Sequence, residues 1–153
     1  MRWLELRVPP PVAVLLVGIA MWLVRRTYPE LGIFIPERRS VYWILLVAGV
    51  AVALTGALQF RRARTTVDPM HPDRASSLVT GGIYRFTRNP MYVGNTLILL
   101  AWAAFLSHPV GVAGVVLYVV WMDILQIAPE ERALRERFGE AYESYCTRVR
   151  RWI

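Results

Sequence analysis

The chain alternates long apolar runs with short polar segments, and the lengths of these runs predict helices that cross a membrane. Residues 41–60 hold no charged side chain over twenty positions, which as an α-helix would be about 30 Å long and match the hydrocarbon thickness of a bilayer. Further apolar runs occupy residues 9–24, 90–106 and 110–127. The pattern predicts an all-α, polytopic membrane protein with about four transmembrane helices and a C-terminal amphipathic helix.

The first run, residues 9–24, is short enough to be compared with a secretory signal. Arg25 and Arg26 follow it directly, where a small-residue cleavage site would stand in a signal peptide. We therefore interpret this run as a retained first helix. The next segment, residues 27–40, contains prolines and a glycine and is predicted to be a loop.

Small side chains and one short turn predict how the helices pack. Gly49, Ala53, Gly56 and Ala57 recur at spacings of three and four, so one face of the second helix can approach a neighbour closely. Residues 107–109 form the whole connection between the last two apolar runs. So short a connection requires the third and fourth helices to form an antiparallel hairpin.

Composition agrees with a membrane protein and argues against nucleic-acid binding. The chain is 56% hydrophobic with a positive mean hydropathy, which is too apolar for an ordinary soluble domain. Its net charge of +7 reflects 18 basic residues, all arginine, in clusters beside the apolar runs. Four of them lie within residues 25–40, and the other fourteen fall on the opposite side of the membrane if there are four spans. The positive-inside tendency places those fourteen and both termini in the cytoplasm, and we expect a bacterial inner-membrane protein.

Cysteine and histidine give no sign of a disulfide or a metal site. The single Cys146 excludes an internal disulfide framework, and a packing role is favoured for it over a nucleophilic one. His71 and His108 have no cysteine or carboxylate at ligand spacing on one helix, so both are expected to be loop residues.

A polar and aromatic stretch leads directly into the third apolar run. Residues 81–94 read GGIYRFTRNPMYVG, Glu130 and Glu131 follow the fourth run, and residues 138–145 read FGEAYESY. In this order the motifs resemble the isoprenylcysteine carboxyl methyltransferase family, whose Tyr…Arg-His-Pro-x-Tyr-x-Gly motif precedes a Glu-Glu pair and a Phe-Gly-x-x-Tyr-x-x-Tyr tail. Phospholipid methyltransferases show a related pattern.

The resemblance implies an enzyme that transfers a methyl group from S-adenosylmethionine. It covers roughly residues 58–153, so we expect one domain in which residues 1–60 supply N-terminal transmembrane helices and residues 61–153 form the catalytic, cofactor-binding region. No alternation of strands and helices accompanies the glycines at 81 and 82, so helices and loops would have to hold the cofactor. The residues expected to bind it are Tyr84, Arg88, Asn89, Pro90, Tyr92, Gly94, Glu130, Glu131, Tyr142 and Tyr145, with Arg88, Asn89 and Glu131 also expected to be catalytic.

Chemical type suggests a role for most of these side chains. Arg88 suits the cofactor carboxylate, Glu130 or Glu131 suits its ammonium or a ribose hydroxyl, and the tyrosines suit adenine stacking or cation–π contact with the sulfonium. Gly94 would let the third helix approach closely. The family's usual histidine is Asn89 here, and an amide cannot titrate and so cannot act as a base.

The C-terminal segment carries one apolar and aromatic stripe. Its members recur at spacings of three and four and are Leu134, Phe138, Tyr142, Tyr145, Val149 and Trp152. We expect an amphipathic helix that starts near Pro129, is interrupted at Gly139, lies on the membrane or over the hairpin, and roofs the cofactor. For Asp123, an interfacial role and a role in the site are both open.

The acceptor implied by the resemblance is a hydrophobic or lipid-like molecule, including the carboxylate of an isoprenylcysteine. A carboxylate acceptor needs no general base, whereas an amine acceptor would first lose a proton to a glutamate or to Asp123. Two other classes stay open. One is an NADPH-dependent membrane reductase, because sterol reductases resemble the same C-terminal region. The other is a non-catalytic membrane module that engages a partner through its tail.

Overall fold

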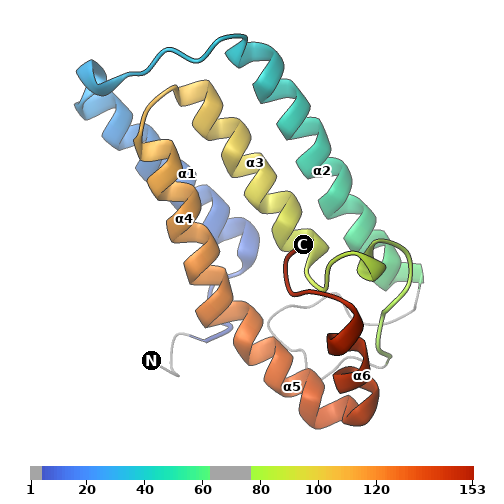
Figure 1. Ribbon diagram of the computed structural model, residues 1–153. Coiled ribbons are helices and arrows are strands. Elements are labelled where there is room, and N and C mark those ends of the chain that lie inside the picture. Colours follow the sequence, from blue (N-terminus) through green and yellow to red (C-terminus); the bar gives the residue numbers. More distant parts are fainter. Residues whose placement is uncertain (1–4, 63–76) are drawn as a thin grey trace.

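The computed structural model describes residues 5–62 and 77–153, and its core is a bundle of helices with a folded C-terminal tail (Figure 1). The bundle consists of α1 (Pro10–Thr27), α2 (Arg38–Arg62), α3 (Pro90–Leu106) and α4 (Val110–Met122), and no strand occurs within these described ranges. Helices α1 and α2, and the helix that runs on from α4, are long and apolar enough to cross a membrane, while α3 is a shorter apolar helix of 17 residues. The predicted all-α, polytopic architecture is confirmed.

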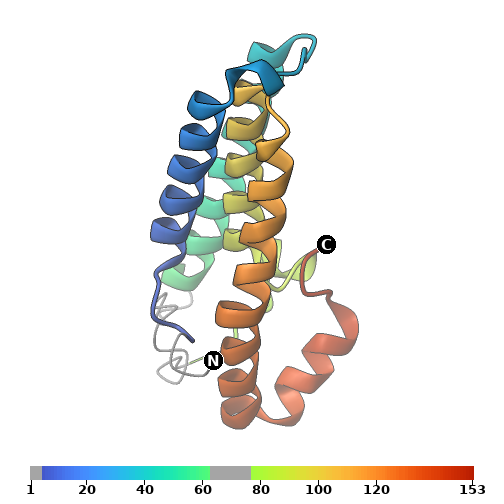
Figure 2. The ribbon, with the colours of Figure 1, turned by 90° about the vertical axis from the view of Figure 1, so that its left-hand side faces the viewer.

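Helix α3 is the centre of the bundle. It packs against α1, α2 and α4, and its contact with α2 is the most extensive. The buried core forms along these contacts from apolar side chains of several helices, including Met21, Tyr92, Leu99, Tyr118 and Met122. Figure 2 shows α1, α3 and α4 running side by side, with the tail diverging below them.

The contact between α2 and α3 depends on glycine. A Cβ atom added at Gly94 would lie 2.6 Å from the Gly49 carbonyl oxygen, and one added at Gly49 would lie 2.7 Å from the Gly94 oxygen. Gly56 lies against Pro90 in the same way, with 3.1 Å between its added Cβ and the proline ring. The predicted small-residue face of residues 41–60 is therefore the face that meets α3, and it fixes where α3 begins.

The turn between α3 and α4 makes the predicted antiparallel hairpin. Ser107 adopts a left-handed conformation with φ of 47°, and its carbonyl oxygen accepts a hydrogen bond from the Ile33 amide at 2.8 Å. His108 is buried in this turn, with Nε2 3.0 Å from the Tyr28 carbonyl oxygen. His108 is thus a structural loop residue, as predicted, while His71 lies outside the described residues.

Pro129 lies in the first turn of α5 (Ala128–Phe138), as predicted. The structure adds that a π-helical turn (Asp123–Ile127) joins α4 to α5 without a break, so that one long helix runs from Val110 to Phe138. A proline cannot donate the hydrogen bond that would reach the Leu125 carbonyl four residues earlier. The Leu6 amide donates to that carbonyl instead, at 3.0 Å, so the N-terminal segment satisfies the group that Pro129 leaves free.

The chain reverses at Gly139, whose φ of 48° and ψ of −126° suit glycine and few other residues. Helix α6 (Glu140–Arg148) then runs back toward the bundle, as Figure 2 shows. Tyr142, Tyr145 and Val149 pack with Leu134, Phe138, Leu78 and Cys146 in a small cluster of their own. The predicted stripe is thus confirmed from Leu134 to Val149, but Trp152 belongs to the larger core of the bundle.

Candidate functional site

The polar residues expected at the site meet at the start of α3. Residues Gly82–Arg85 form a single 3-10 turn before it, and Gly82, with φ of 58°, lies so close to Gln59 that an added Cβ would clash with that side chain. Asn89 is the residue before the helix, and Pro90 is its first residue, where a missing N–H does no harm. The local sequence therefore ends a tight loop and begins a helix beside the start of α5.

Arg88 and Glu131 form a buried ion pair. Arg88 Nη2 lies 3.1 Å from Glu131 Oε1, and the two side chains are 13% and 8% exposed. The predicted hairpin of α3 and α4 brings the start of α3 and the start of α5 to the same end of the bundle, and the two side chains meet there. Glu131 lies in the first turn of α5, whose amide groups favour a negative charge.

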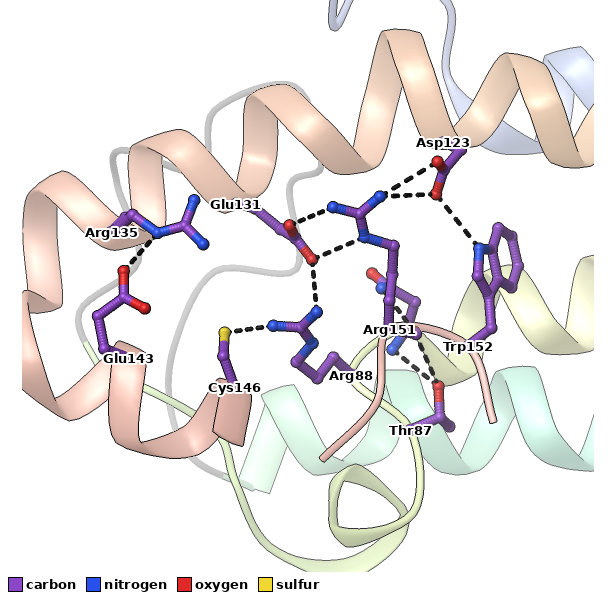
Figure 3. A network of polar contacts seen from close by, with 10 residues as sticks. Thr87, Arg88, Asp123, Glu131, Arg135, Glu143, Cys146, Arg151 and Trp152 are labelled. Carbon is purple, nitrogen blue, oxygen red and sulfur yellow. Dashed lines mark hydrogen bonds and ion pairs between the residues drawn. The ribbon is translucent and has the colours of Figure 1, made fainter. Parts of the chain in front are cut away.

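Arg151, which the sequence analysis did not single out, completes this network (Figure 3). Its guanidinium donates to both oxygens of Glu131, at 3.1 and 2.6 Å, and to both oxygens of Asp123, at 3.1 Å each. Its hydrogen bond to Glu131 is the main reason that the pKa of Arg151 is raised. Asp123 also accepts from Trp152 Nε1 at 3.3 Å, so the structure places Asp123 in the network of the site.

The backbone of the C-terminal segment is held against the start of α3. The Arg88 amide donates to the Arg150 carbonyl at 3.0 Å, and Asn89 Nδ2 donates to the Arg151 carbonyl at 2.9 Å. Thr87 Oγ1 reaches the same Arg151 oxygen at 3.3 Å. The Asn89 side-chain amide therefore positions the tail. The three residues before Pro90 all form hydrogen bonds with the backbone of Arg150 or Arg151.

Two buried donors have no hydrogen-bond partner among the described residues, Arg88 Nε and the Tyr84 hydroxyl. Arg88 uses its other nitrogens for Glu131 and for Cys146, whose sulfur accepts from Nη1. Burial, and then the nearby Tyr145 and Glu130, raise the pKa of Tyr84, so its hydroxyl stays a neutral donor. Leaving a buried donor unpaired costs about 1 to 3 kcal/mol, so both atoms mark a place where a polar ligand would be stabilised.

The tyrosines of the tail lie on the same side of the site. The Tyr145 hydroxyl donates to the Tyr84 carbonyl at 2.7 Å, and the rings of Tyr142 and Tyr145 lie 6.3 Å apart between centroids. Charges at Arg88 and Glu131 act on Tyr142, whose pKa is raised chiefly by burial. These rings thus border the ion-pair network.

The two neighbouring glutamates face different partners. Glu130 accepts from the Tyr92 hydroxyl at 2.5 Å and from Gln126 Nε2 at 2.7 Å, whereas Glu131 faces the arginines. Tyr92 and Glu130 therefore form a second polar cluster inside the bundle. Pro90 and Gly94 pack against α2, at Gly56 and Gly49, so the structure places both in a helix contact. No group of three histidine, cysteine or acidic side chains within the described ranges could hold a metal ion.

The amino-acid sequence is similar to that of one known protein family. The family model described as phospholipid methyltransferase matches residues 38–141. The chain belongs to the phospholipid methyltransferase family. The matched range includes α2, α3 and both glutamates, but it ends before Arg151.

Named relatives of this family member include methyltransferases. A probable protein-S-isoprenylcysteine O-methyltransferase of rice (Oryza sativa subsp. indica) is 28% identical over 126 residues, which cover 77% of this chain and 65% of the rice protein. An uncharacterized protein of Haemophilus influenzae is 40% identical over 63 residues, 41% of this chain and 100% of that protein. Together, the family and the rice protein support a membrane methyltransferase.

A shorter similarity points to another enzyme class. The chicken (Gallus gallus) Delta(14)-sterol reductase LBR is 31% identical over 77 residues, 47% of this chain and 12% of that protein. No solved structure matches the chain significantly.

Proposed function

We propose that the protein is an S-adenosylmethionine-dependent membrane methyltransferase that acts on a hydrophobic or lipid-like acceptor. The observation that carries the proposal is the Arg88–Glu131–Arg151 network, centred on the buried Glu131, beside two unpaired buried donors at one end of a bundle of apolar helices. Family membership adds the type of reaction.

The residues present fit the chemistry of S-adenosylmethionine. Arg88 would hold the carboxylate, because its free Nε is a buried, charged donor. Glu131 would hold the ammonium or a ribose hydroxyl. The Tyr84 hydroxyl would donate to a polar oxygen of the cofactor, and the rings of Tyr142 and Tyr145 offer a surface for adenine.

The cofactor, when bound, supplies an electrophilic methyl group, and the protein has to align the acceptor and exclude water. We propose a lipid-like acceptor that reaches the site from the bilayer, with the carboxylate of an isoprenylcysteine as the leading class because of the rice relative. Such an acceptor needs no general base. For an amine acceptor, Glu130 would be the group to receive the proton, since its hydrogen-bond partners within the described ranges are the uncharged Tyr92 and Gln126.

The orientation proposed for this site is toward the cytoplasm, where S-adenosylmethionine is available. The end of α1 and the start of α2, which together carry four arginines, lie at the opposite end of the bundle from the start of α3 and from α5 and α6 (Figure 1). The positive-inside tendency supports this orientation, because the site end carries most of the arginines.

A reductase is the second candidate, supported by the similarity to the chicken sterol reductase. Titration of the purified protein with S-adenosylhomocysteine and with NADPH, followed by thermal unfolding, separates the classes. We expect S-adenosylhomocysteine alone to raise the unfolding temperature. Stabilisation by NADPH alone would assign the reductase, and stabilisation by neither would favour a non-catalytic membrane module.

A further inference from the structure

An apolar groove opens between α1 and α2, at the end of the bundle away from the candidate site. Its volume is about 440 Å³, within the range of pockets that bind small molecules. Helix α3 lines it with Ile98 and Trp102, while Gly18 and Trp22 come from α1 and Tyr42 and Leu46 from α2. Both α1 and α2 pack on α3, so α3 forms the floor and the other two helices form the walls.

The groove fits within one leaflet of a bilayer. Its lining on α1 runs from Val14 to Trp22, about 12 Å of helix, which is less than half of the roughly 30 Å hydrocarbon core. On α3 the lining begins at Ile98, nine residues after Asn89 and thus about 14 Å from the candidate site. Trp22 and Tyr42 stand near the helix ends, where aromatic rings commonly mark the headgroup level.

Basic side chains surround the outer end of the groove. The Arg26 guanidinium lies 5.3 Å from the centre of the Trp22 ring. Arg38 lies one helical turn before Tyr42 on α2, and with Arg39 and Glu37 it lines a second hollow of about 470 Å³. These three arginines are exposed, and none of them forms an ion pair within the described part of the chain.

We propose that this groove binds an acyl chain of an anionic phospholipid from the leaflet opposite the candidate site, with the phosphate held by Arg38, Arg39 and Arg26. Guanidinium groups suit phosphate oxygens, and arginines near the membrane surface attract anionic lipids. The headgroup charge would complement residues 25–39, which contain four arginines and two glutamates. The site is separate from the proposed methyltransferase site and does not depend on it.

The dimensions of the groove favour a lipid chain over a helix of a second copy. A helix with its side chains is about 10 to 12 Å across, so a 12 Å length of it would fill roughly 1,000 Å³ or more. That is more than twice the volume of the groove. A lipid chain is thin enough to enter, and it would contact α1 and α2 at the same time.

Gly18 allows the groove to be filled without disturbing the helices. A Cβ added there would meet only Trp102 atoms, at 3.9 Å, which is ordinary contact. We expect Gly18→Leu to lower the affinity for dioleoylphosphatidylglycerol at least ten-fold, measured by native mass spectrometry of the full-length protein in detergent. Ala20→Leu is the control, because it also introduces a leucine, at an exposed position of α1 outside the groove, and should leave the affinity unchanged.

The same assay tests the role of the arginines and of the lipid's negative charge. It compares the affinity for dioleoylphosphatidylglycerol with that for dioleoylphosphatidylcholine, which has the same acyl chains and no net charge. The unaltered protein should bind one molecule of phosphatidylglycerol more tightly than phosphatidylcholine. The double variant Arg38→Gln, Arg39→Gln should lose about five-fold in phosphatidylglycerol affinity for each arginine. Arg61→Gln, Arg62→Gln, at the other end of α2, should lose nothing.

Three results would overturn the proposal. They are equal affinity of the unaltered protein for the two lipids, unchanged phosphatidylglycerol binding by Gly18→Leu, and displacement of phosphatidylglycerol by S-farnesylcysteine. The last result would assign the groove to the tail of a prenylated acceptor. None of the three depends on methyl transfer, so each can be told apart from a failure of the proposed enzyme activity.

Discussion

At the scale of single residues, Glu131 joins two distant parts of the chain at the candidate site. Glu131 is 6% exposed, and its two oxygens are shared by Arg88, from the segment before α3, and Arg151, from the end of the chain. A buried carboxylate is tolerated only when such partners compensate its lost hydration. Arg151 also binds Asp123, the first residue of the π-helical turn. One side chain of the tail therefore contacts both the π-helical turn and the first turn of α5.

The first prediction concerns Arg88. If its free Nε meets the cofactor carboxylate, Arg88→Ala should weaken S-adenosylhomocysteine binding about ten- to a hundred-fold, since a charge-assisted hydrogen bond contributes roughly 1.5 to 3 kcal/mol. Arg88→Lys should restore little, because an ammonium lacks the planar fork. Isothermal titration calorimetry measures both. Arg132→Ala, which removes an exposed pair with Glu5, is the control. Parental affinity in Arg88→Ala would place the cofactor elsewhere.

The second prediction concerns Glu131 and stability. Glu131→Gln removes the carboxylate from two arginines and should lower the free energy of unfolding by about 3 kcal/mol, as breaking a buried ion pair commonly does. Glu143→Gln breaks an ion pair with Arg135 at the surface, where the Glu143 side chain is 53% exposed and the Arg135 side chain 46%. This change should lower the free energy of unfolding by less than about 1 kcal/mol. Denaturant unfolding in detergent compares the two. Equal losses would show that the Glu131 network contributes no more than a surface pair.

At the scale of helices, the tail belongs to the site. Gly139 reverses the chain, α6 packs Tyr142 and Tyr145 beside Arg88, and the following residues bind the start of α3 through backbone hydrogen bonds. Most contacts of the bundle lie outside these residues, because α1, α2 and α4 all pack on α3, although Trp152 packs against the bundle core. We therefore expect the bundle to fold without the tail.

A truncation after Phe138 should abolish S-adenosylhomocysteine binding and leave the bundle folded. It removes Arg151 and both tail tyrosines while retaining Arg88 and Glu131. Circular dichroism and size-exclusion chromatography would confirm the fold, and calorimetry would measure binding. A folded truncation that still binds the ligand would reduce the tail to a role in membrane attachment.

The helices were easier to predict than the contacts of the tail. Long apolar runs with a proline at 90 and a three-residue turn determine α3 and the hairpin almost residue by residue. Pro129 correctly marked the first turn of α5, but no sequence signal showed that α5 continues from α4 without a break or that the Leu6 amide bonds the Leu125 carbonyl. Arg151 had no periodic signal or motif, and its role depends on how the tail folds after Gly139.

At the scale of the whole molecule, the two ends of the bundle differ in charge. The last turn of α1 and the first turn of α2 carry four arginines, and most of the others lie in the segments near α5, α6 and the start of α3. We predict that both termini lie in the cytoplasm. Alkaline phosphatase and green fluorescent protein fused to the C-terminus test this. Phosphatase activity there would contradict both the topology and the access of the site to the cofactor.

The shortness of α3 has a consequence for the membrane itself. Its 17 residues span about 25 Å, so α3 is some 5 Å shorter than a typical hydrocarbon core and creates a hydrophobic mismatch. If the C-terminal end of α3 lies at the headgroup level, Arg88 and Asn89 at its other end would lie below the average level of the membrane surface. The bilayer around them would then have to be locally thinner. We expect S-adenosylhomocysteine affinity and turnover to be higher in vesicles of short-chain than of long-chain phosphatidylcholine, and equal values would contradict this. Local thinning would bring the reactive end of a membrane-held acceptor to the site while its tail stays in the bilayer.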